Sequence, residues 1–176
     1  LSGSIFSRSI FNEHFDVTKS TILRYCIYVG CSSPNPGGAL FSNDFPLYVL
    51  FCSFLDCMSS SDGGGMRNVK GNLEMKCVLF KWCHANGGNF QLSGHAFGAS
   101  SCNSICNDTT FCLCWNSTES YKDNVFGFDD GEVHINRIND TQCQSLNGGL
   151  GGSFSLLSAE SSIEFIQVEG GYEFCA

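Results

Sequence analysis

A cysteine-containing unit recurs along this chain at nearly constant intervals. The first cysteines of successive units are Cys26, Cys52, Cys77 and Cys102, and the intervals between them are 26, 25 and 25 residues. A second cysteine comes four to six residues later in each unit, at Cys31, Cys57, Cys83 and Cys106. Repeats of roughly 20 to 50 residues are typical of solenoids, in which each unit buries its apolar face only against its neighbours. The period therefore predicts a stack of units.

Glycines form a third column of the repeat. They follow the cysteines in the first three units, at Gly37 and Gly38, Gly63 to Gly65, and Gly87 and Gly88. The pattern returns in "INDTQC", where Ile138 replaces the leading cysteine, Cys143 is the second, and Gly148 with Gly149 fills the glycine column. A sixth, weaker unit is expected in "IEFIQVEGGYEF". Residues 116–134 interrupt the register and are expected to form an insertion.

The units have the composition of short β-strands. Segments such as "YVLFCSFL" and "EMKCVLF" are rich in Val, Ile, Leu, Phe, Tyr and Cys, and Gly, Asn, Ser and Asp bound them. No unit has a leucine ladder or apolar residues at helical spacing. Stacked coils of this kind place equivalent residues about 4.8 Å apart, with small side chains at crowded corners. We therefore expect an all-β, right-handed parallel β-helix of five to six rungs over residues 20–176.

Both ends of this stack need an explanation. Residues 1–19 are expected to form an N-terminal cap, because Phe6, Ile10, Phe11 and Phe15 fall near one face of a short helix. At the other end, "IEFIQVEGGYEFCA" stops without a capping element. An open rung exposes unpaired backbone groups and core side chains. We therefore expect the C-terminal rung to be covered by a partner or by further chain.

The glycine motif resembles that of a known class of repeat. "PGGALF", preceded by paired cysteines and followed by "DGGGM" and "NGGNF" in later units, is similar to the polymorphic outer-membrane-protein β-helix repeats, which also occur in surface proteins of parasitic flagellate protists. Gly37–Leu40 matches the GGA-aliphatic motif in full, and Phe54–Asp56 matches only part of the companion motif. The resemblance implies a right-handed β-helix that acts as a surface-displayed or adhesive module without enzymatic activity.

Charge and hydropathy exclude two classes of partner. Nine Lys and Arg stand against 17 Asp and Glu, so a formal charge of −8 repels phosphate backbones and anionic lipid. The longest nearly apolar run, Phe45 to Leu55, is about half of the roughly 20 residues that a membrane helix needs. We therefore expect no nucleic acid and no membrane span. A protein partner or a larger assembly is expected, with a glycan as a further candidate.

The twelve cysteines permit two redox states. Stacked cysteines about 4.8 Å apart could form disulfides, but a ladder of inward free thiols has the same spacing, and we favour the thiols. No CxxC pair occurs, and the repeat already explains "CLC" at Cys112 to Cys114 and the cysteines near His84 and His95. We expect no metal site and no cofactor.

Carboxylates in the expected insertion suggest a rival function. Asp129 and Asp130, followed by Glu132 and His134, could serve in a polysaccharide-cleaving β-helix enzyme. However, "SGHAFG" precedes this pair, and "NRIND" only loosely matches the pattern of such enzymes. The same carboxylates, with Asp123, could bind calcium, but their spacing does not match the DxDxDG loop. An acidic surface turn is the favoured interpretation, with no catalytic and no metal-binding residue.

The chain also contains glycosylation sequons, at Asn107, Asn116 and Asn139. Three is close to the number that chance gives in a chain this rich in Asn, Ser and Thr, so they do not indicate a compartment. We expect a non-enzymatic scaffold or binding module of the surface or adhesion type. A structural component of an intracellular filament or cytoskeletal assembly is the alternative, and free thiols would favour it.

Overall fold

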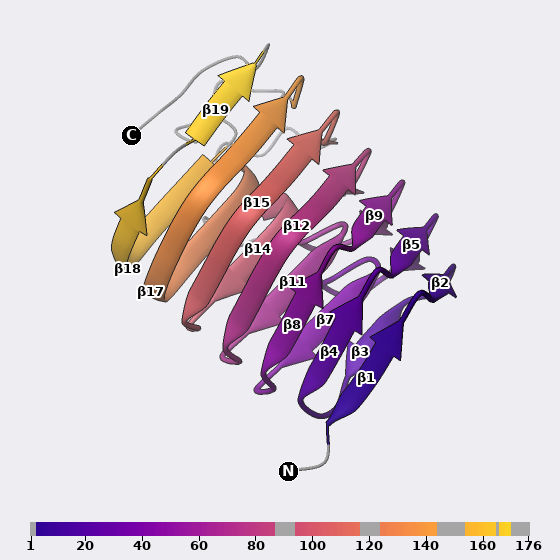
Figure 1. Ribbon diagram of the computed structural model, residues 1–176. Coiled ribbons are helices and arrows are strands. Elements are labelled where there is room, and N and C mark those ends of the chain that lie inside the picture. The colour runs from indigo at the N-terminus through magenta and orange to yellow at the C-terminus, as the bar shows by residue number, and fades with distance from the viewer. Residues whose placement is uncertain (1–2, 87–93, 117–123, 144–153, 165, 170–176) are drawn as a thin grey trace.

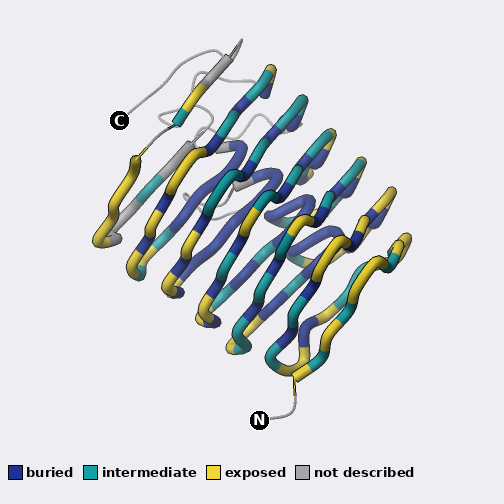
Figure 2. The backbone as a smooth tube through the Cα atoms, viewed as in Figure 1, coloured by how far each residue is buried: buried dark blue, intermediate teal, exposed yellow. Residues whose placement is uncertain are grey.

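The computed structural model describes residues 3–86, 94–116, 124–143, 154–164 and 166–169. Within these residues the chain is all-β, and parallel strands stack as a β-solenoid of about five turns (Figure 1). Buried and exposed residues alternate along the strands, so each strand presents one side to the interior and one to solvent (Figure 2). The parallel β-helix predicted from the repeat is confirmed.

Each turn contributes strands to three long faces and one short one. Face 1 consists of β1 (Ser4–Ser7), β4 (Thr21–Arg24), β8 (Leu47–Leu50) and parts of β12 (Leu73–Lys81), β15 (Ser104–Cys112), β17 (Asn124–Thr141) and β18 (Phe154–Ile163). Face 2 consists of β2 (Ile10–Phe11), β5 (Ile27–Val29), β9 (Ser53–Leu55), the later parts of β12, β15 and β17, and β19 (Ile166–Glu169). Face 3 contains β3 (Phe15–Val17), β7 (Leu40–Asn43), β11 (Met66–Val69), β14 (Gly94–Ser100) and the first parts of β17 and β18. A short sheet holds β6 (Ser32–Ser33), β10 (Met58–Ser59), β13 (His84–Ala85) and β16 (Trp115–Asn116).

Aromatic rings form the centre of the core. Tyr28, Phe54, Phe80 and Phe111 occupy the same inward position on face 2 in four successive turns, and their rings stack at 4.9, 4.8 and 5.0 Å between centroids. The next position in this column is Asp140, and the stack instead continues onto Phe126 of face 3, 4.2 Å from Phe111. Stacked rings bury large apolar area between turns, which is the main force holding the turns together.

The second cysteine column is confirmed for Cys31, Cys57 and Cys83, which lie three residues beyond the paired rings. The column then continues with Cys114 and Cys143, which the register places in the same position. The assignment of Cys106 to this column was wrong. Cys106 pairs with Met75 on face 1, because 31 residues separate Cys83 from its equivalent Cys114.

The first cysteine column is correct only in part. Cys26 and Cys52 are equivalent, and Ile138 occupies the same column, as expected. In the turn that contains β12, however, the equivalent residue is Val78, and Cys77 lies at the corner before it. Cys102 also falls outside the column, because it precedes the face 1 part of β15 and lies against Gly131 of the next turn.

The segment 116–134 is not an insertion over its whole length. Residues 124–134 belong to β17, which pairs with β14 and β15 on its two faces. Residues 117–123 lie outside the described part of the chain. In the expected sixth unit, β19 pairs with β17 through Ile166 and its neighbours, while Phe165 and residues 170–176 are outside the described part.

The N-terminal segment contains strands where a short helix was expected. Residues 4–17 form β1, β2 and β3, which pair with β4, β5 and β7 as a first turn of the solenoid. Phe6, Phe11 and Phe15 point inward and form an edge-on cluster, with centroids 5.2 to 5.9 Å apart, while Ile10 is 74 % exposed. The segment covers the first aromatic ring of the core, since Phe11 stacks on Tyr28.

The glycine column marks the place where the turn after the short sheet enters face 3. Gly37 and Gly63 have φ values of 72° and 62°, which residues with a Cβ rarely adopt. The glycines after them are needed for a different reason: a Cβ on Gly64 would lie 2.0 Å from the carbonyl oxygen of His84. The backbones therefore touch at this point, and no side chain fits between them. Gly87, Gly88, Gly148 and Gly149 lie outside the described residues.

All eleven described cysteines are free thiols, and Cys175 lies outside the described residues. Burial raises the pKa of Cys52 to about 11 and also raises the pKa values of Cys83 and Cys106. These thiols therefore stay protonated and unreactive at neutral pH. Cys77 and Cys112 are only half-buried.

We expect an alkylating reagent without reductant to label Cys77 and Cys112 of the native protein first, because the other described thiols are buried. Unfolding in denaturant should then expose all eleven, and peptide mass spectrometry after each step gives the sites. Fewer than eleven labelled sites after unfolding would contradict the free-thiol core and would favour an oxidising compartment.

Candidate functional site

The corner between face 1 and face 2 is a column of left-handed residues. They share φ values between 53° and 63°, at Arg8, Tyr25, Phe51, Cys77, Asp108 and Arg137. One such residue bends the strand so that two consecutive side chains point outward, and both Arg24 and Tyr25 are indeed exposed. The corner therefore presents a continuous row of side chains to solvent.

The row changes its chemistry along the solenoid axis. The rings of Tyr25 and Phe51 stack outside the protein at 5.0 Å and 14°, and they are 53 % and 42 % exposed. Cys77 comes next and is small. Beyond it, Asp108 forms an ion pair with Arg137. After Arg8 in the first turn, the second and third turns thus carry an aromatic corner and the last described turns a charged one.

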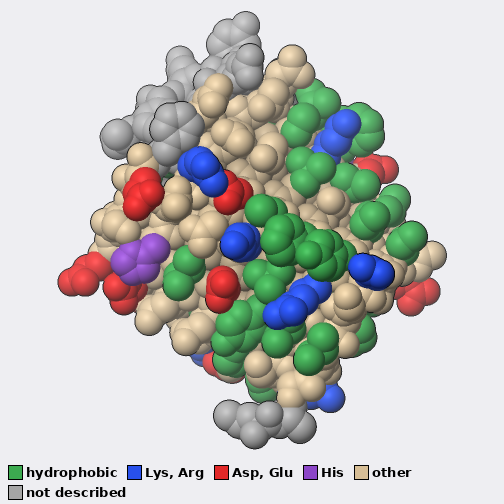
Figure 3. Space-filling model, in the orientation of Figure 1, with side chains coloured by type: hydrophobic (Ala, Val, Ile, Leu, Met, Phe, Trp, Pro, Cys, Tyr) green, Lys and Arg blue, Asp and Glu red, His purple; other side chains and the backbone are tan. Residues whose placement is uncertain are grey.

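The outward positions beside the corner change in the same way. In the first three turns they are mostly apolar, at Ile5, Ile10, Ile22, Ile27, Val29, Tyr48, Leu50 and Leu55. In the later turns the equivalent positions are mostly polar, at Glu74, Lys76, Lys81, Asn107, Thr110, His134, Asn136, Asn139 and Thr141, with Leu79, Ile105 and Cys112 as the exceptions. We call the outward side chains of the first three turns on faces 1 and 2, with their corner, the apolar face. Figure 3 shows these side chains gathered on one side of the molecule.

The fold itself does not require this apolar face. The backbone and register are the same where the later turns carry Asn and Thr, so outward apolar residues are not needed to form the solenoid. From the strand spacing and rise, the face spans roughly 25 Å by 14 Å, or about 350 Å². Exposed apolar patches of several hundred Å² on soluble proteins commonly mark interaction sites.

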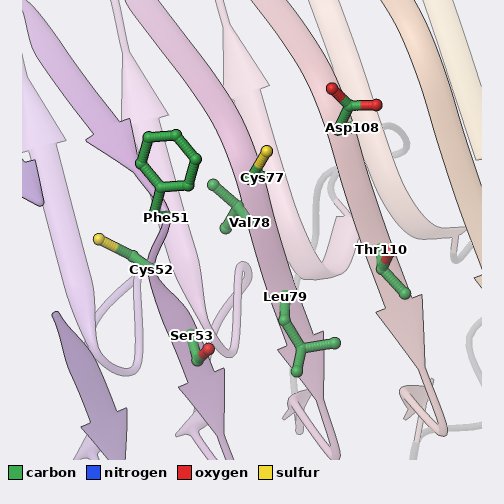
Figure 4. Close-up of a pocket in the computed structure, with 8 residues that line it drawn as sticks. All are labelled: Phe51, Cys52, Ser53, Cys77, Val78, Leu79, Asp108 and Thr110. Atoms are coloured by element: carbon green, nitrogen blue, oxygen red, sulfur yellow. The ribbon is translucent and has the colours of Figure 1, made fainter. Parts of the chain in front are cut away.

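A hollow of about 420 Å³ lies at the boundary between the two halves of the corner (Figure 4). It forms because Cys77 is small and sits between the larger side chains of Phe51 and Asp108 in the corner column. Leu79 and Thr110, from the face 2 parts of β12 and β15, line it as well. The hollow has an aromatic and aliphatic wall on one side and polar groups on the other.

Two basic residues lie beside this hollow. Lys76 and Lys81 lie on β12 on either side of Cys77 and Leu79, and within the described part of the chain neither pairs with a carboxylate. The ammonium group of Lys81 lies 4.4 Å from the ring centroid of Trp82, an exposed residue. Neither lysine lines the hollow itself, but both lie beside it on β12, in a protein whose net charge is −8.

The expected acidic loop is not present as a loop. Asp129, Asp130 and Glu132 lie within β17, and Asp123 falls outside the described residues. Asp130 occupies another corner with φ 61°, and its Oδ1 accepts a hydrogen bond from the Gly131 N–H at 2.9 Å. The carboxylate of Asp130 thus stabilises a turn. The described residues contain no group of three or more His, Cys, Asp or Glu side chains that could hold a metal ion.

A hydrogen-bonded chain links Glu132, His134 and Ser162 on face 1. His134 Nε2 lies 2.9 Å from Glu132 Oε1, and Nδ1 lies 2.6 Å from Ser162 Oγ. Sequence analysis singled out Glu132 and His134 but missed Ser162, which the register of β18 places beside His134. The side chains of His134 and Glu132 are 49 % and 53 % exposed, so water competes for both bonds. The arrangement can pass a proton between side chains, but it lies on an open strand surface.

The glycosylation candidates occupy different settings. Asn107 directly precedes the corner residue Asp108, and its sequon Thr109 is fully buried. Asn139 lies half-buried on face 2. Asn116 ends β16, and its side chain is outside the described part. The structure therefore does not bring these three residues together in one site.

Comparisons of this chain with models of protein families, with curated proteins and with solved structures each found no match. Among the described residues, no helix is long and apolar enough to cross a membrane. The candidate site therefore rests on its geometry and chemistry alone: an exposed apolar surface on two faces of the solenoid, with a hollow and basic residues at its edge.

Proposed function

We propose that this chain is a non-enzymatic β-solenoid module that binds a protein partner through its apolar face. One observation carries the proposal: equivalent outward positions are apolar in the first three turns and polar in the later turns, although the backbone is the same. Selection for folding alone gives no reason for this difference. Binding to a partner gives a reason, because removing apolar surface from water contributes about 25 cal/mol per Å² to the free energy of binding.

The size of the face indicates the kind of complex. About 350 Å² is less than half of the roughly 800 Å² that each partner buries in a standard stable interface. A single module should therefore bind weakly, and tight attachment would need several modules or a second contact. Such a role suits the adhesive, surface-displayed module that the GGA-type repeat implies. It suits equally a component of a filament or cytoskeletal assembly.

The last described turn offers a possible second contact. Ile163 is in register with Ile135, which is buried in the core, yet Ile163 is 43 % exposed. This exposure supports the proposal that a partner covers this rung. Contact at this end would add to the area buried at the apolar face.

The proposal predicts that substitutions on the apolar face remove binding without unfolding the protein. Random peptides displayed on phage should be selected on the native protein and their affinities measured by interferometry. Replacing both Tyr25 and Phe51 with Thr should weaken the selected peptides by about tenfold or more, because both side chains are exposed anchors. The melting temperature should change by no more than a few degrees, since neither ring contributes to the core.

A matched control comes from the polar half of the same faces. Replacing Asn136 and Thr141 with Ala should leave the affinity of those peptides unchanged, because both positions lie beyond the apolar face. The proposal would be overturned if the peptides bound the Tyr25/Phe51 double variant with the same affinity as the native protein and lost their affinity for the control variant.

A further inference from the structure

We infer that the hollow beside Cys77 is an anchor site for an acidic protein segment that inserts one large apolar side chain. The inference rests on the proposed function and specifies the chemistry of the partner. It follows from three features of the hollow: its walls, the charges at its rim and its position at the edge of the apolar face.

The walls suit an apolar side chain. Phe51 closes one end with its ring, while Leu79 supplies aliphatic surface from β12. A volume of about 420 Å³ lies near the lower end of the range for ligand sites, which is roughly 300 to 1,000 Å³. This space holds a single aromatic or branched side chain with part of its backbone. Asp108 lies at the opposite end of the hollow. Its carboxylate pairs with Arg137, so it does not favour a cationic side chain in the bound segment.

The charges around the hollow favour an acidic partner. The apolar face and the adjoining strand β12 carry four outward basic side chains, Arg8, Arg24, Lys76 and Lys81, against Glu74 on β12 and Asp56 at the corner after β9. Lys76 and Lys81 stand on opposite sides of the hollow along one strand. Carboxylates before and after the anchor residue of a bound segment would therefore each meet an ammonium group. A basic segment would meet repulsion at both places.

The charge of the whole chain strengthens this conclusion. Residues 1–81 contain 7 Lys and Arg and 6 Asp and Glu, which gives this part a net charge of +1. Residues 82–176 contain 2 Lys and Arg and 11 Asp and Glu, which gives a net charge of −9. The basic residues are thus concentrated in the turns that carry the apolar face. An acidic partner would be attracted to this end of the solenoid and repelled from the other.

A second copy of the chain is a poorer occupant than a separate acidic segment. Among the described residues, its best acidic segment with an exposed apolar residue is the one around Ile163, with Glu160 and Glu164 on either side. Ile163 occupies an inward register position, so its side chain points along the core and does not project as an anchor. Two apolar faces pressed together would bring their basic residues into contact. The occupant is therefore a different protein that carries carboxylates on both sides of an apolar residue.

Cys77 provides a direct measure of occupancy because its half-buried thiol lines the hollow. The probe is the peptide acetyl-EEDFLDEE-amide, with acetyl-EEDAADEE-amide and acetyl-KKRFLRKK-amide as controls for anchor and charge. At about 5 mM peptide and low salt, the acidic Phe-Leu peptide should slow alkylation of Cys77 by about fivefold or more. Alkylation of Cys112, which does not line the hollow, should stay within about twofold of its free rate.

Variants test the charge requirement in the same assay. Lys76→Glu combined with Lys81→Glu should abolish protection by the acidic peptide and create protection by the basic one, because both rim charges are reversed. Both lysines point outward, so far-UV circular dichroism and melting temperature should match the native protein. Protection that survives this double substitution would overturn the role of the rim charges.

Several outcomes would overturn the inference itself. Equal protection by the Ala-Ala peptide would show that no anchor enters the hollow, and equal protection by the basic peptide would show that charge does not select the partner. Protection that rises with the concentration of the protein alone would identify a second copy as the occupant. Absence of protection by any peptide would also overturn it. If selected peptides still bind through Tyr25 and Phe51 in these cases, the proposed function stands and only the partner chemistry is wrong.

Discussion

Gly64→Ala is expected to destabilise the protein by more than about 3 kcal/mol, and at ordinary growth temperatures to leave little folded chain. The added Cβ would lie 2.0 Å from the carbonyl oxygen of His84 and 2.4 Å from its carbonyl carbon. Both atoms belong to the backbone of β13, which pairs on both sides within the short sheet. Neither atom can move away without breaking those pairs, so the turn would have to separate from the sheet.

Gly30→Asn is the control, because Gly30 has nothing within 4 Å of its Cβ position, although its φ is positive at 62°. The same corner carries Asp56 and Trp82 in the next turns, with φ values of 53° and 56°. We expect a loss of less than about 1 kcal/mol for this substitution. Thermal unfolding followed by circular dichroism compares the two variants. A Gly64→Ala protein as stable as Gly30→Asn would show that the turn does not touch β13.

The repeat was readable from the sequence because its inward positions recur in the chain with the same small residue. Cys31, Cys57 and Cys83 stand 26 residues apart, and each fills the same inward position. The assignment failed for the fourth unit because that turn is longer, and a constant period then selects Cys106 over Cys114. The positions of the cysteines alone cannot show which of the two belongs to the column. Inward positions accept any small or apolar side chain, so cysteines occur in more than one column.

The N-terminal segment shows the limit of apolar spacing as a signal. Phe6, Phe11 and Phe15 are separated by five and four residues, which is compatible with one side of a helix. Left-handed residues at corners produce a similar spacing, because Arg8 at φ 54° shifts the inward alternation between β1 and β2. Apolar spacing therefore cannot distinguish a helix from a strand that bends at a corner.

Little of the candidate site could be predicted from the sequence, because the site consists of residues that point outward. Whether Tyr25 or Phe51 faces solvent depends on the corner, and no residue type marks that corner: Arg, Tyr, Phe, Cys and Asp all occupy it. One signal was present. Both aromatic residues directly precede a cysteine of the first column, Cys26 or Cys52, and this shared position places them side by side. The hollow, in contrast, depends on side chains from three different turns.

The aromatic core leads to the second large expected effect. Phe80→Ala should lower the free energy of unfolding by about 3 to 5 kcal/mol. Phe80 is fully buried in the middle of the solenoid, and its ring lies 4.8 Å from Phe54 and 5.0 Å from Phe111. Its removal leaves a cavity between the turns on either side, and in a solenoid each turn is stabilised only by its neighbours. The two parts of the stack should therefore also lose cooperativity, which would broaden the transition and lower its apparent m value.

Phe51→Ala removes the same atoms from the neighbouring corner, where the ring is 42 % exposed, and should cost less than about 1 kcal/mol. Urea unfolding followed by circular dichroism at 25 °C measures both variants against the native protein. Phe80→Leu separates loss of volume from loss of ring stacking, and we expect its effect to fall between those of the two alanine variants because it refills most of the cavity. If Phe80→Ala and Phe51→Ala cost the same, the inward column is not the core of the stack. The assignment of the outward apolar residues to binding would then fail with it, because it depends on the same separation of inward from outward side chains.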